Sequence, residues 1–510
     1  MPVVDLLGGK MIRKILLFLM VGSWGIALAA PWETLPPDHW AYAEIRWLQV
    51  QGFLGSLNPS AGIYRRGEIA DALKADPKPQ AGVGQNRFKL LEDEFASEMS
   101  GRGGWQFFGG GRLVGGFESR HGVEGREAGY GVIIYGAGTD HLGIYAAIRG
   151  DRDQGSNPDY AGKKWRDLTG FTEAAYLIFA AKRWEVKLGR DHYARGPGSD
   201  HLILNDAARG VDGLSFKLHW RWGQFEGLIG QVNDFSDSTG SRSNRFFSGH
   251  RLEVVPWQWL RLGFSETLLF SSLRFGSMNP FLPYYGELVN ENSEGNGMLG
   301  LDVNAFPLKG LQFYGELLLD DIQIEEKIPK DLEPTEWGWL VGLRWAGLNG
   351  LLGAAVSYEG ITNRTYNAKE PQYRYTNYGL PLGSDLGNDA DRLNLVASCW
   401  PDARLRLDAL FEFHRQGEGG MDAPFDTTYL NYTVEQGYDE PFPTGIIERT
   451  TGAGIGFAAF AHPLLQARGE IMREWISNVG NIADVKDNGW RGRVEIILRL
   501  DHFVRRQSKM

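Results

Sequence analysis

The residues with the greatest capacity for chemistry gather in one segment, from Arg190 to Asp206. Carboxylates and imidazoles lie close together there, and such groups serve both in metal sites and in acid–base catalysis. The members of this set are Asp191, His192, Asp200, His201 and Asp206. Their spacing matches no recognised set of metal ligands, so we predict no catalytic residue, no metal site and no cofactor.

The same segment also has an electrostatic interpretation. Its cationic side chains are Arg190, His192, Arg195 and His201, and Gly196-Pro197-Gly198 permits sharp turns between them. They predict either a loop that attracts anions inside a pore or a loop that plugs the pore through ion pairs. We take these four residues as candidates for binding an acidic glycan.

Three further stretches combine aromatic rings with polar or cationic side chains. Sugars stack on planar apolar faces and hydrogen-bond through their hydroxyls, and acidic sugars also attract Arg. The candidates are Tyr284, Tyr285, Tyr373, Arg374, Tyr375, Tyr378, Tyr429 and Tyr432. The alternative is that these tyrosines pack the loops together or lie at a membrane interface.

Secondary-structure elements must position these candidates. The clearest such element in the sequence is the last one, from Trp490 to Phe503. Apolar side chains alternate there with charged ones, so a period of two places the two sets on opposite faces of one strand. A soluble sandwich would bury the apolar face in a core. A strand of about 10 residues with this pattern also fits a barrel that crosses a membrane.

The composition narrows the class of protein. The chain has 510 residues, with 68 glycines, 17 tryptophans and 12% aromatic residues. No internal run of about 18 apolar residues is present, which argues against helical membrane spans. The net charge is −10 and no basic arm occurs, which argues against nucleic acid as a partner. Cys399 is the only cysteine, so internal disulfides and cysteine zinc sites are excluded.

The N-terminal 100 residues divide into two parts. Residues 1–29 predict a signal peptide, because Arg13 and Lys14 precede an apolar run that ends in small residues; either Met1 or Met11 can be its start. Residues 30–100 predict a small helical domain. We expect Asp38 to cap a first helix that Gly52 ends. A second helix is predicted over 66–74 and a third over 86–99.

Residues 105–503 predict a barrel, followed by a tail over 504–510. Eighteen strands are expected, starting near Trp105, Gly129, His141, Gly170, Arg183, Asp212, Gly223, Arg245, Trp257, Gly297, Gly310, Glu336, Gly350, Asp391, Ala403, Thr450, Pro463 and Gly489. Tight turns alternate with long polar links over 151–169, 190–211, 271–296, 361–390 and 416–449. This alternation, with an even strand count, indicates an outer-membrane barrel rather than a sandwich.

The strands have one apolar and one charged face. In the strand from Glu336, Trp337, Trp339, Val341, Leu343 and Trp345 form a lipid-facing set with tryptophan at both ends. The charged faces should point into the lumen and include Lys217, Arg221, Arg404, Arg406, Arg491, Arg493, Glu495 and Arg499. We expect those of the last strand to neutralise charges on neighbouring strands.

Two stretches resemble known families. Gly189-Arg190, Gly196-Pro197-Gly198, His201 to Leu204 and Asn205-Asp206-Ala207 are similar to a stretch of the Wzi-like capsule assembly proteins. That resemblance implies an 18-stranded outer-membrane barrel with a periplasmic helical bundle and a role in holding or assembling surface polysaccharide. His39-Trp40-Ala41-Tyr42 and Arg65-Arg66-Gly67-Glu68 resemble one S-layer homology module, a family that usually binds cell-wall polymer through several such modules. Because one module is visible here, the alternative is a small periplasmic packing domain.

Three functions remain open. The first is a non-enzymatic, lectin-like barrel whose extracellular loops bind or help to assemble capsular polysaccharide or exopolysaccharide. Its partners would be that polysaccharide, outer-membrane lipid and, through the helical domain in the periplasm, peptidoglycan. The alternative is a diffusion porin, which an open lumen would favour. The third is a barrel enzyme such as a lipid or glycan hydrolase, which a carboxylate pair or a Ser–His pair in hydrogen-bonding reach beneath the loops would favour.

Overall fold

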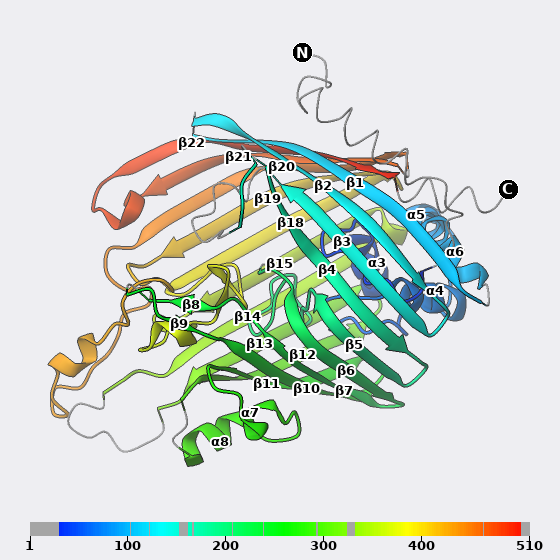
Figure 1. The fold of residues 1–510 in the computed structure, drawn as a ribbon. Helices are drawn as coiled ribbons and strands as arrows, with labels where there is room; N and C mark the ends of the chain where they lie inside the picture. Colours follow the sequence, from blue (N-terminus) through cyan, green and yellow to red (C-terminus); the bar gives the residue numbers. More distant parts are fainter. Residues whose placement is uncertain are drawn as a thin grey trace.

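The computed structural model describes residues 30–101, 104–121, 123–151, 162–165, 168–206, 208–237, 239–291, 294–323, 332–462 and 464–500. The predicted signal peptide, the tail, Pro463 and Phe503 lie outside these residues. Within them, eighteen antiparallel strands form one sheet that closes into a barrel (Figure 1). The closure joins the first and last strands, where Arg112 lies opposite Arg499 and Arg120 opposite Arg491.

The barrel strands follow the predicted order. They are β1 (Gln106–Arg120), β2 (Val123–Gly138), β3 (Leu142–Asp151), β4 (Thr169–Ala180), β5 (Trp184–Asp191), β6 (Val211–Trp220), β7 (Gly223–Gln231), β10 (Phe246–Trp257), β11 (Leu260–Phe270), β12 (Asn296–Leu308), β13 (Leu311–Asp321), β14 (Glu336–Gly347), β15 (Leu352–Ile361), β18 (Ala390–Asp402), β19 (Leu405–Gln416), β20 (Glu448–His462), β21 (Leu465–Ser477) and β22 (Lys486–Arg499). The predicted fold class, an 18-stranded antiparallel barrel, is confirmed.

The two ends of the barrel differ. At one, here called the turn end, short turns join β2 to β3, β4 to β5 and so on to β20 and β21. At the other, the loop end, lie the long connections, which contain β8 (Phe235–Ser236), β9 (Arg242–Ser243), α7 (Phe275–Met278), α8 (Tyr284–Glu291), β16 (Thr376–Asn377) and β17 (Leu380–Pro381). The β1–β2 connection is an exception, because it lies at the loop end and spans only residues 121–122.

The side chains alternate between the outside and the lumen as the period of two requires. On β14, Trp337, Val341 and Trp345 are exposed on the outer face, whereas Leu340 and Arg344 between them are buried in the lumen. Polar groups are therefore largely restricted to the inner face, as in barrels that meet lipid with their outer face. Among the described residues, no helix has the length and apolar character needed to cross a membrane.

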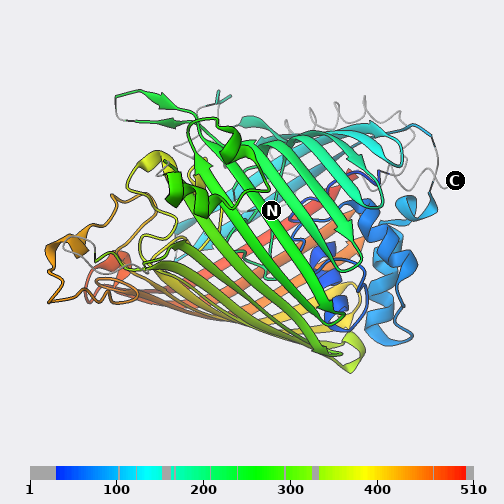
Figure 2. The same cartoon turned by 90° about the horizontal axis from the view of Figure 1, so that it is seen from below.

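A helical region covers the turn end (Figure 2). It contains α3 (Ala41–Val50), α4 (Arg66–Ala75), α5 (Gly82–Glu94) and α6 (Ala96–Ser100), packed around Leu48, Ile69, Leu73 and Leu91. It is attached to the barrel by a hydrogen bond of 2.8 Å from the amide of Gly310, in the β12–β13 turn, to the carbonyl of Val50. Trp47 also packs edge-on against Trp400 of β18 at 5.4 Å.

The prediction that Asp38 caps the first helix is wrong. The helix starts after Trp40, and no side chain caps it. The Asp38 carboxylate instead accepts hydrogen bonds from Arg112 of β1 at 2.6 Å and from Tyr130 of β2 at 2.8 Å. A partner from the lumen wall thus replaces the helix N-terminus, because a guanidinium pairs with a carboxylate more strongly than a backbone amide does.

His39 gives the helical region a pH dependence. Its Nδ1 accepts the Ala41 amide hydrogen at 3.1 Å, and burial together with Arg499 lowers the pKa of His39 to about 3. The unfolded imidazole takes up a proton near pH 6.5, so stability is full above that pH and decreases as the pH falls towards 3. We expect the helical region to lose about 2 kcal/mol more between pH 7.5 and 5 than a His39→Gln variant loses, measured by thermal unfolding followed by tryptophan fluorescence. Equal losses in the two proteins would contradict this expectation.

Candidate functional site: the lumen plug and the loops above it

The described residues between β5 and β6, 192–206 and 208–210, fold into the lumen and form a plug. Its ends are joined by a hydrogen bond of 2.9 Å from the Arg195 amide to the Leu204 carbonyl. The Arg195 guanidinium pairs with Glu226 on the lumen face of β7 and donates to the Ala61 carbonyl of the helical region at 3.4 Å. The plug therefore contacts both the wall and the helical region, as one of the two predicted interpretations required.

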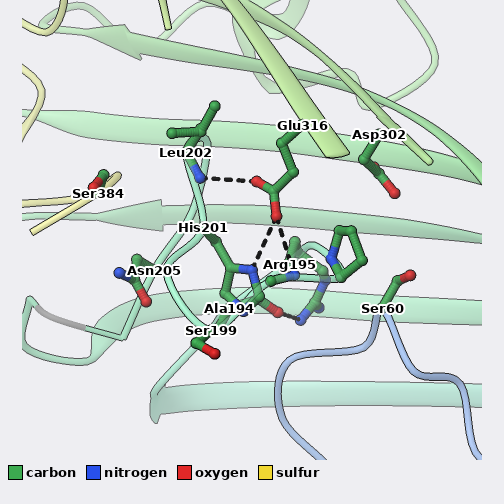
Figure 3. A network of polar contacts seen from close by, with 12 residues as sticks. Ser60, Ala194, Arg195, Ser199, His201, Leu202, Asn205, Asp302, Glu316 and Ser384 are labelled. Atoms are coloured by element: carbon green, nitrogen blue, oxygen red, sulfur yellow. Dashed lines mark hydrogen bonds and ion pairs between the residues drawn. The ribbon is translucent and has the colours of Figure 1, made fainter. Parts of the chain in front are cut away.

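Glu316 of β13 is the main anchor of the plug. Figure 3 shows its carboxylate between the His201 imidazole and the Leu202 amide, at 3.3 and 2.9 Å. The Gly198 amide donates to the same carboxylate at 3.4 Å. Gly196 has a φ of +137°, and a Cβ on it would overlap Glu316 and His201. Only glycine fits this turn without strain.

A second loop, residues 362–389, lies on top of the plug. Tyr366 and Tyr375 stack with ring centres 5.7 Å apart, and both are fully buried. Tyr366 donates its hydroxyl hydrogen to the Leu202 carbonyl, and Tyr375 donates to the Ile203 carbonyl at 2.6 Å. The two rings thus bind the backbone of the plug from the loop side.

The plug and the second loop share an apolar core inside the lumen. Its wall side chains come from β6, β7 and the strands β10 to β15. The core consists of Tyr193, Leu202, Ile203, Leu204, Ala208, Val211, Leu228, Val232, Phe247, Leu269, Met298, Tyr314, Leu318, Leu340, Ile361, Tyr366, Tyr375 and Leu382. This half of the lumen is filled by packed protein.

The opposite half of the lumen is more polar. On β22, Arg491 pairs with Glu474 at 3.3 Å, and Glu495 pairs with Arg468 of β21 at 2.7 Å. Arg499 pairs with Glu94 of the helical region at 3.6 Å. The first two pairs join β22 to the neighbouring strand β21, as expected, whereas the third joins β22 to the helical region. Arg493 lies 3.8 Å from Glu495 and keeps 57% of its side chain exposed.

Of the remaining predicted lumen charges, two lie on the lumen face of strands and two lie in turns at the end of the barrel. Lys217 faces the lumen between Glu185 of β5 and Glu226 of β7, directly opposite both in the sheet register. Arg406 pairs with Asp408 at 3.0 Å. Arg221 and Arg404 lie in turns at the turn end and are exposed to solvent, outside the lumen wall.

A third loop, residues 417–447, completes the loop end around Arg364. The Arg364 side chain is 1% exposed and donates to both Glu440 oxygens at 2.8 Å and to Asp426 at 2.9 Å. Burial opposes the charge, but Glu440 and Asp426 together raise the pKa of Arg364 above its ordinary value. Glu440 also accepts the Tyr438 hydroxyl hydrogen at 3.0 Å. One buried cation therefore joins the second loop to the third.

Most of the predicted glycan-binding residues are structural in this conformation. Tyr284, Tyr373, Tyr375 and Tyr429 are buried. Arg195 and His201 hold the plug, and His192 lies against the small space lined by Arg112 and Glu173. Arg374 donates to the Ala423 carbonyl at 2.6 Å, and Tyr285 to Asp321 at 3.5 Å. Arg190 points to the outer face, where it pairs with Asp212. The buried tyrosines therefore fit the alternative in which they pack the loops together.

The accessible candidates lie on the surface of the loop end. Tyr432 is 42% exposed and its ring centre lies 5.0 Å from that of Tyr438, directly above the Glu440–Arg364 pair. Tyr378 is half-buried under the guanidinium of Arg209 at 4.5 Å. Sequence reasoning missed Arg364, Glu440 and Tyr438, because nothing in the local pattern sets them apart from other loop residues.

The fold and this site define a class, an outer-membrane β-barrel with a plugged lumen. A family comparison is more specific: residues 97–488 match the family Capsule assembly protein Wzi, and the chain belongs to that family. No curated protein matches the chain.

Several solved structures are similar to the chain at low sequence identity. The Escherichia coli outer-membrane protein Wzi, described as a carbohydrate-binding β-barrel involved in group 1 capsule assembly, matches with a TM-score of 0.61 and 14% identity, over 93% of this chain and 99% of that one. OccK3 of Pseudomonas aeruginosa gives a TM-score of 0.45 and 11% identity over 77% and 95% of the two chains. A BenF-like porin of Pseudomonas fluorescens gives 0.45 and 10% over 78% and 98%.

Proposed function

We propose that this barrel binds surface polysaccharide through its loop end and thereby holds or helps to assemble a capsule. The observation that carries the proposal is the closed loop end, where three loops are packed into one surface that presents the Tyr432–Tyr438 pair above the buried Arg364. Membership of the capsule assembly family and the carbohydrate binding of the Escherichia coli relative support it. Rigid aromatic faces beside a held cation suit a polysaccharide that contains acidic sugars.

The proposal includes an orientation in the outer membrane. The long loops face the outside of the cell, and the helical region lies in the periplasm, because short turns are typical of the periplasmic end. The exposed tryptophans and leucines of the outer face contact lipid. Residues 30–100 are a domain that resembles one S-layer homology module and contacts peptidoglycan, and residues 1–29 are the export signal. No catalytic step belongs to this glycan-binding function.

Retention of polysaccharide tests the glycan-binding proposal. Purified full-length protein is immobilised and surface polysaccharide from the same cells is titrated over it. Replacing both Tyr432 and Tyr438 by alanine is expected to weaken retention about tenfold, since each aromatic contact contributes about 0.5–1.5 kcal/mol. The control is Tyr135→Ala, an exposed tyrosine on the outer wall of β2. Equal losses in both variants would contradict the proposed surface.

A diffusion porin is the second candidate, and one observation favours it. The lumen-facing side chains Arg493, Arg468 and Glu470 on β21 and β22 are more than one third exposed, so water reaches this half of the lumen. Single-channel conductance in planar bilayers separates the two functions. We expect near-silence because the plug and helical region obstruct the path. Stable steps of porin size would establish the second candidate instead.

A further inference from the structure

The connection between β11 and β12 folds against the outside of the barrel. Its residues 271–291 contain α7 and α8, which lie beside the outer wall at the loop end of β10 and β11 (Figures 1 and 2). The plug and the second loop instead fold into the lumen, where Leu202 and Tyr366 are buried. Residues 271–291 are therefore placed next to the lipid-facing strands rather than over the lumen.

Apolar contacts hold this segment on the wall. The alternation of side chains along β11 places Leu268 and Phe270 on the outer face of the barrel. Both are nevertheless buried, because they pack in one cluster with Tyr284 and Leu288 of α8. A Cβ at Gly297 of β12 would overlap Leu288, so glycine at this position permits the close approach of α8. The segment is thus packed closely on the strands beneath it.

Polar contacts add to this attachment. The Tyr284 amide, at the start of α8, donates a hydrogen bond to Glu266 of β11 at 3.0 Å. Glu266 also pairs with His250 of β10 at 3.0 Å, and the Tyr284 ring lies over His250 with ring centres 4.8 Å apart. A carboxylate at a helix N-terminus is stabilising, whereas ionisable groups that face lipid are costly. α8 therefore shields a polar patch of the outer wall and is held there by it.

Much of the surface that the segment leaves uncovered is also apolar. The exposed fractions are 61% for Leu273, 90% for Phe275, 71% for Phe281 and 69% for Val289. A helical segment packed on a wall in water would present polar side chains on its free side. Exposed apolar patches mark contact with a membrane or a partner. Arg274, also exposed, can extend from this apolar surface to the phosphate of a lipid headgroup.

The position of Phe281 identifies the partner of this surface. Its ring stacks on Phe225 of β7 with ring centres 5.4 Å apart. In the sheet register Phe225 lies opposite Leu252, near the middle of β10, and the same row continues through Phe264 of β11 to Leu301 of β12. Leu252, Phe264 and Leu301 are exposed on the lipid-facing wall. Phe281 therefore lies at the level of a row that meets lipid, below the polysaccharide surface of the loop end.

We propose that residues 271–291 form a lipid anchor, in which α7 and α8 are embedded in the membrane leaflet that surrounds the loop end. The exposed apolar side chains contact the acyl chains of a lipid with a phosphate headgroup, and Arg274 contacts the phosphate. Because the segment continues directly from β11 and is fixed to the wall through Tyr284 and Leu288, the anchor sets the depth of the loop end in the membrane. This contact with lipid is independent of glycan binding at the loop end.

Quenching by lipid tests the anchor. Cys399, the only cysteine, is replaced by serine in the full-length protein, and single cysteines introduced elsewhere are labelled with a nitrobenzoxadiazole fluorophore. The labelled barrels are reconstituted in vesicles of phosphatidylethanolamine and phosphatidylglycerol that include a phospholipid with a nitroxide on its acyl chain. We expect Phe281→Cys to lose as much emission as the matched control Leu301→Cys, on the same lipid-facing row. Glu435→Cys, in the exposed third loop, should lose none.

Val289→Cys is a second test position, so the experiment does not depend on the folding of one variant, and only variants that migrate as folded barrels are compared. Quenching of both positions by aqueous iodide, without quenching by the nitroxide lipid, would overturn the proposal. Shielding from iodide that requires added surface polysaccharide would assign the face to the polysaccharide surface and overturn it too. Lipid quenching that disappears as the ratio of protein to lipid rises would assign the face to a second copy of the chain instead.

Discussion

Replacing Arg364 by methionine is expected to open the loop end and to cause the largest loss of polysaccharide binding among single substitutions in the loops. Arg364 is almost fully buried, and Glu440 and Asp426 surround it. Removing one partner of a buried ion pair typically costs about 3–5 kcal/mol, because the remaining charge stays uncompensated. Without the guanidinium, the second and third loops lose their common anchor.

Limited proteolysis of residues 417–447 measures this opening, and titration with polysaccharide measures its consequence. Arg190→Met is the matched control, since Arg190 forms a more exposed pair with Asp212 on the outer wall. Pairs of that kind contribute about 0–1 kcal/mol, so the control should be cleaved like the wild type. Identical cleavage rates for Arg364→Met and the wild type would show that the loops hold together without Arg364.

The second large effect is expected from Gly196→Ala, which should displace the plug. The added methyl group would overlap the Glu316 carboxylate and the His201 ring, and φ at this position is +137°. The steric overlap and the strained backbone conformation together cost about 1–3 kcal/mol or more. This cost is comparable with the stability that the hydrogen bonds to Glu316 give the plug. The barrel itself should still form, because its strands do not depend on this turn.

Swelling of liposomes that contain the protein measures the displacement. Wild-type protein should admit small sugars slowly and Gly196→Ala faster, at an unchanged yield of folded barrel. Gly492→Ala is the control, because a Cβ at Gly492 of β22 meets no neighbour. Equal permeability of Gly196→Ala and the wild type would contradict the expectation that displacing the plug opens a path past the helical region.

The barrel could be predicted from the sequence because its pattern is local. Each strand carries its own alternation of apolar and charged residues, so the strand count and most starts follow from a period of two. The start of β2 is an informative miss, at Val123 rather than near Gly129. Residues 123–128 show no apolar alternation, and pairing with β1, for example of Arg126 with Glu118, makes them a strand.

The interior of the site could not be predicted in the same way. Arg364 has its acidic partners 62 and 76 residues further along the chain, in another loop. Tyr375 looks like an accessible sugar platform in sequence, and only the folding of its loop over the plug buries it.

The most direct measurement of glycan binding at the loop end is the affinity of the purified full-length protein for surface polysaccharide from the same cells. The protein is reconstituted in lipid with the loop end accessible. Saturable binding that is at least about tenfold weaker in Arg364→Met and unchanged in Arg190→Met is the result we predict, since a loss of 1.4 kcal/mol corresponds to a factor of ten. Binding that does not saturate, or that is equally strong in Arg364→Met, would contradict a polysaccharide-binding surface built by these loops.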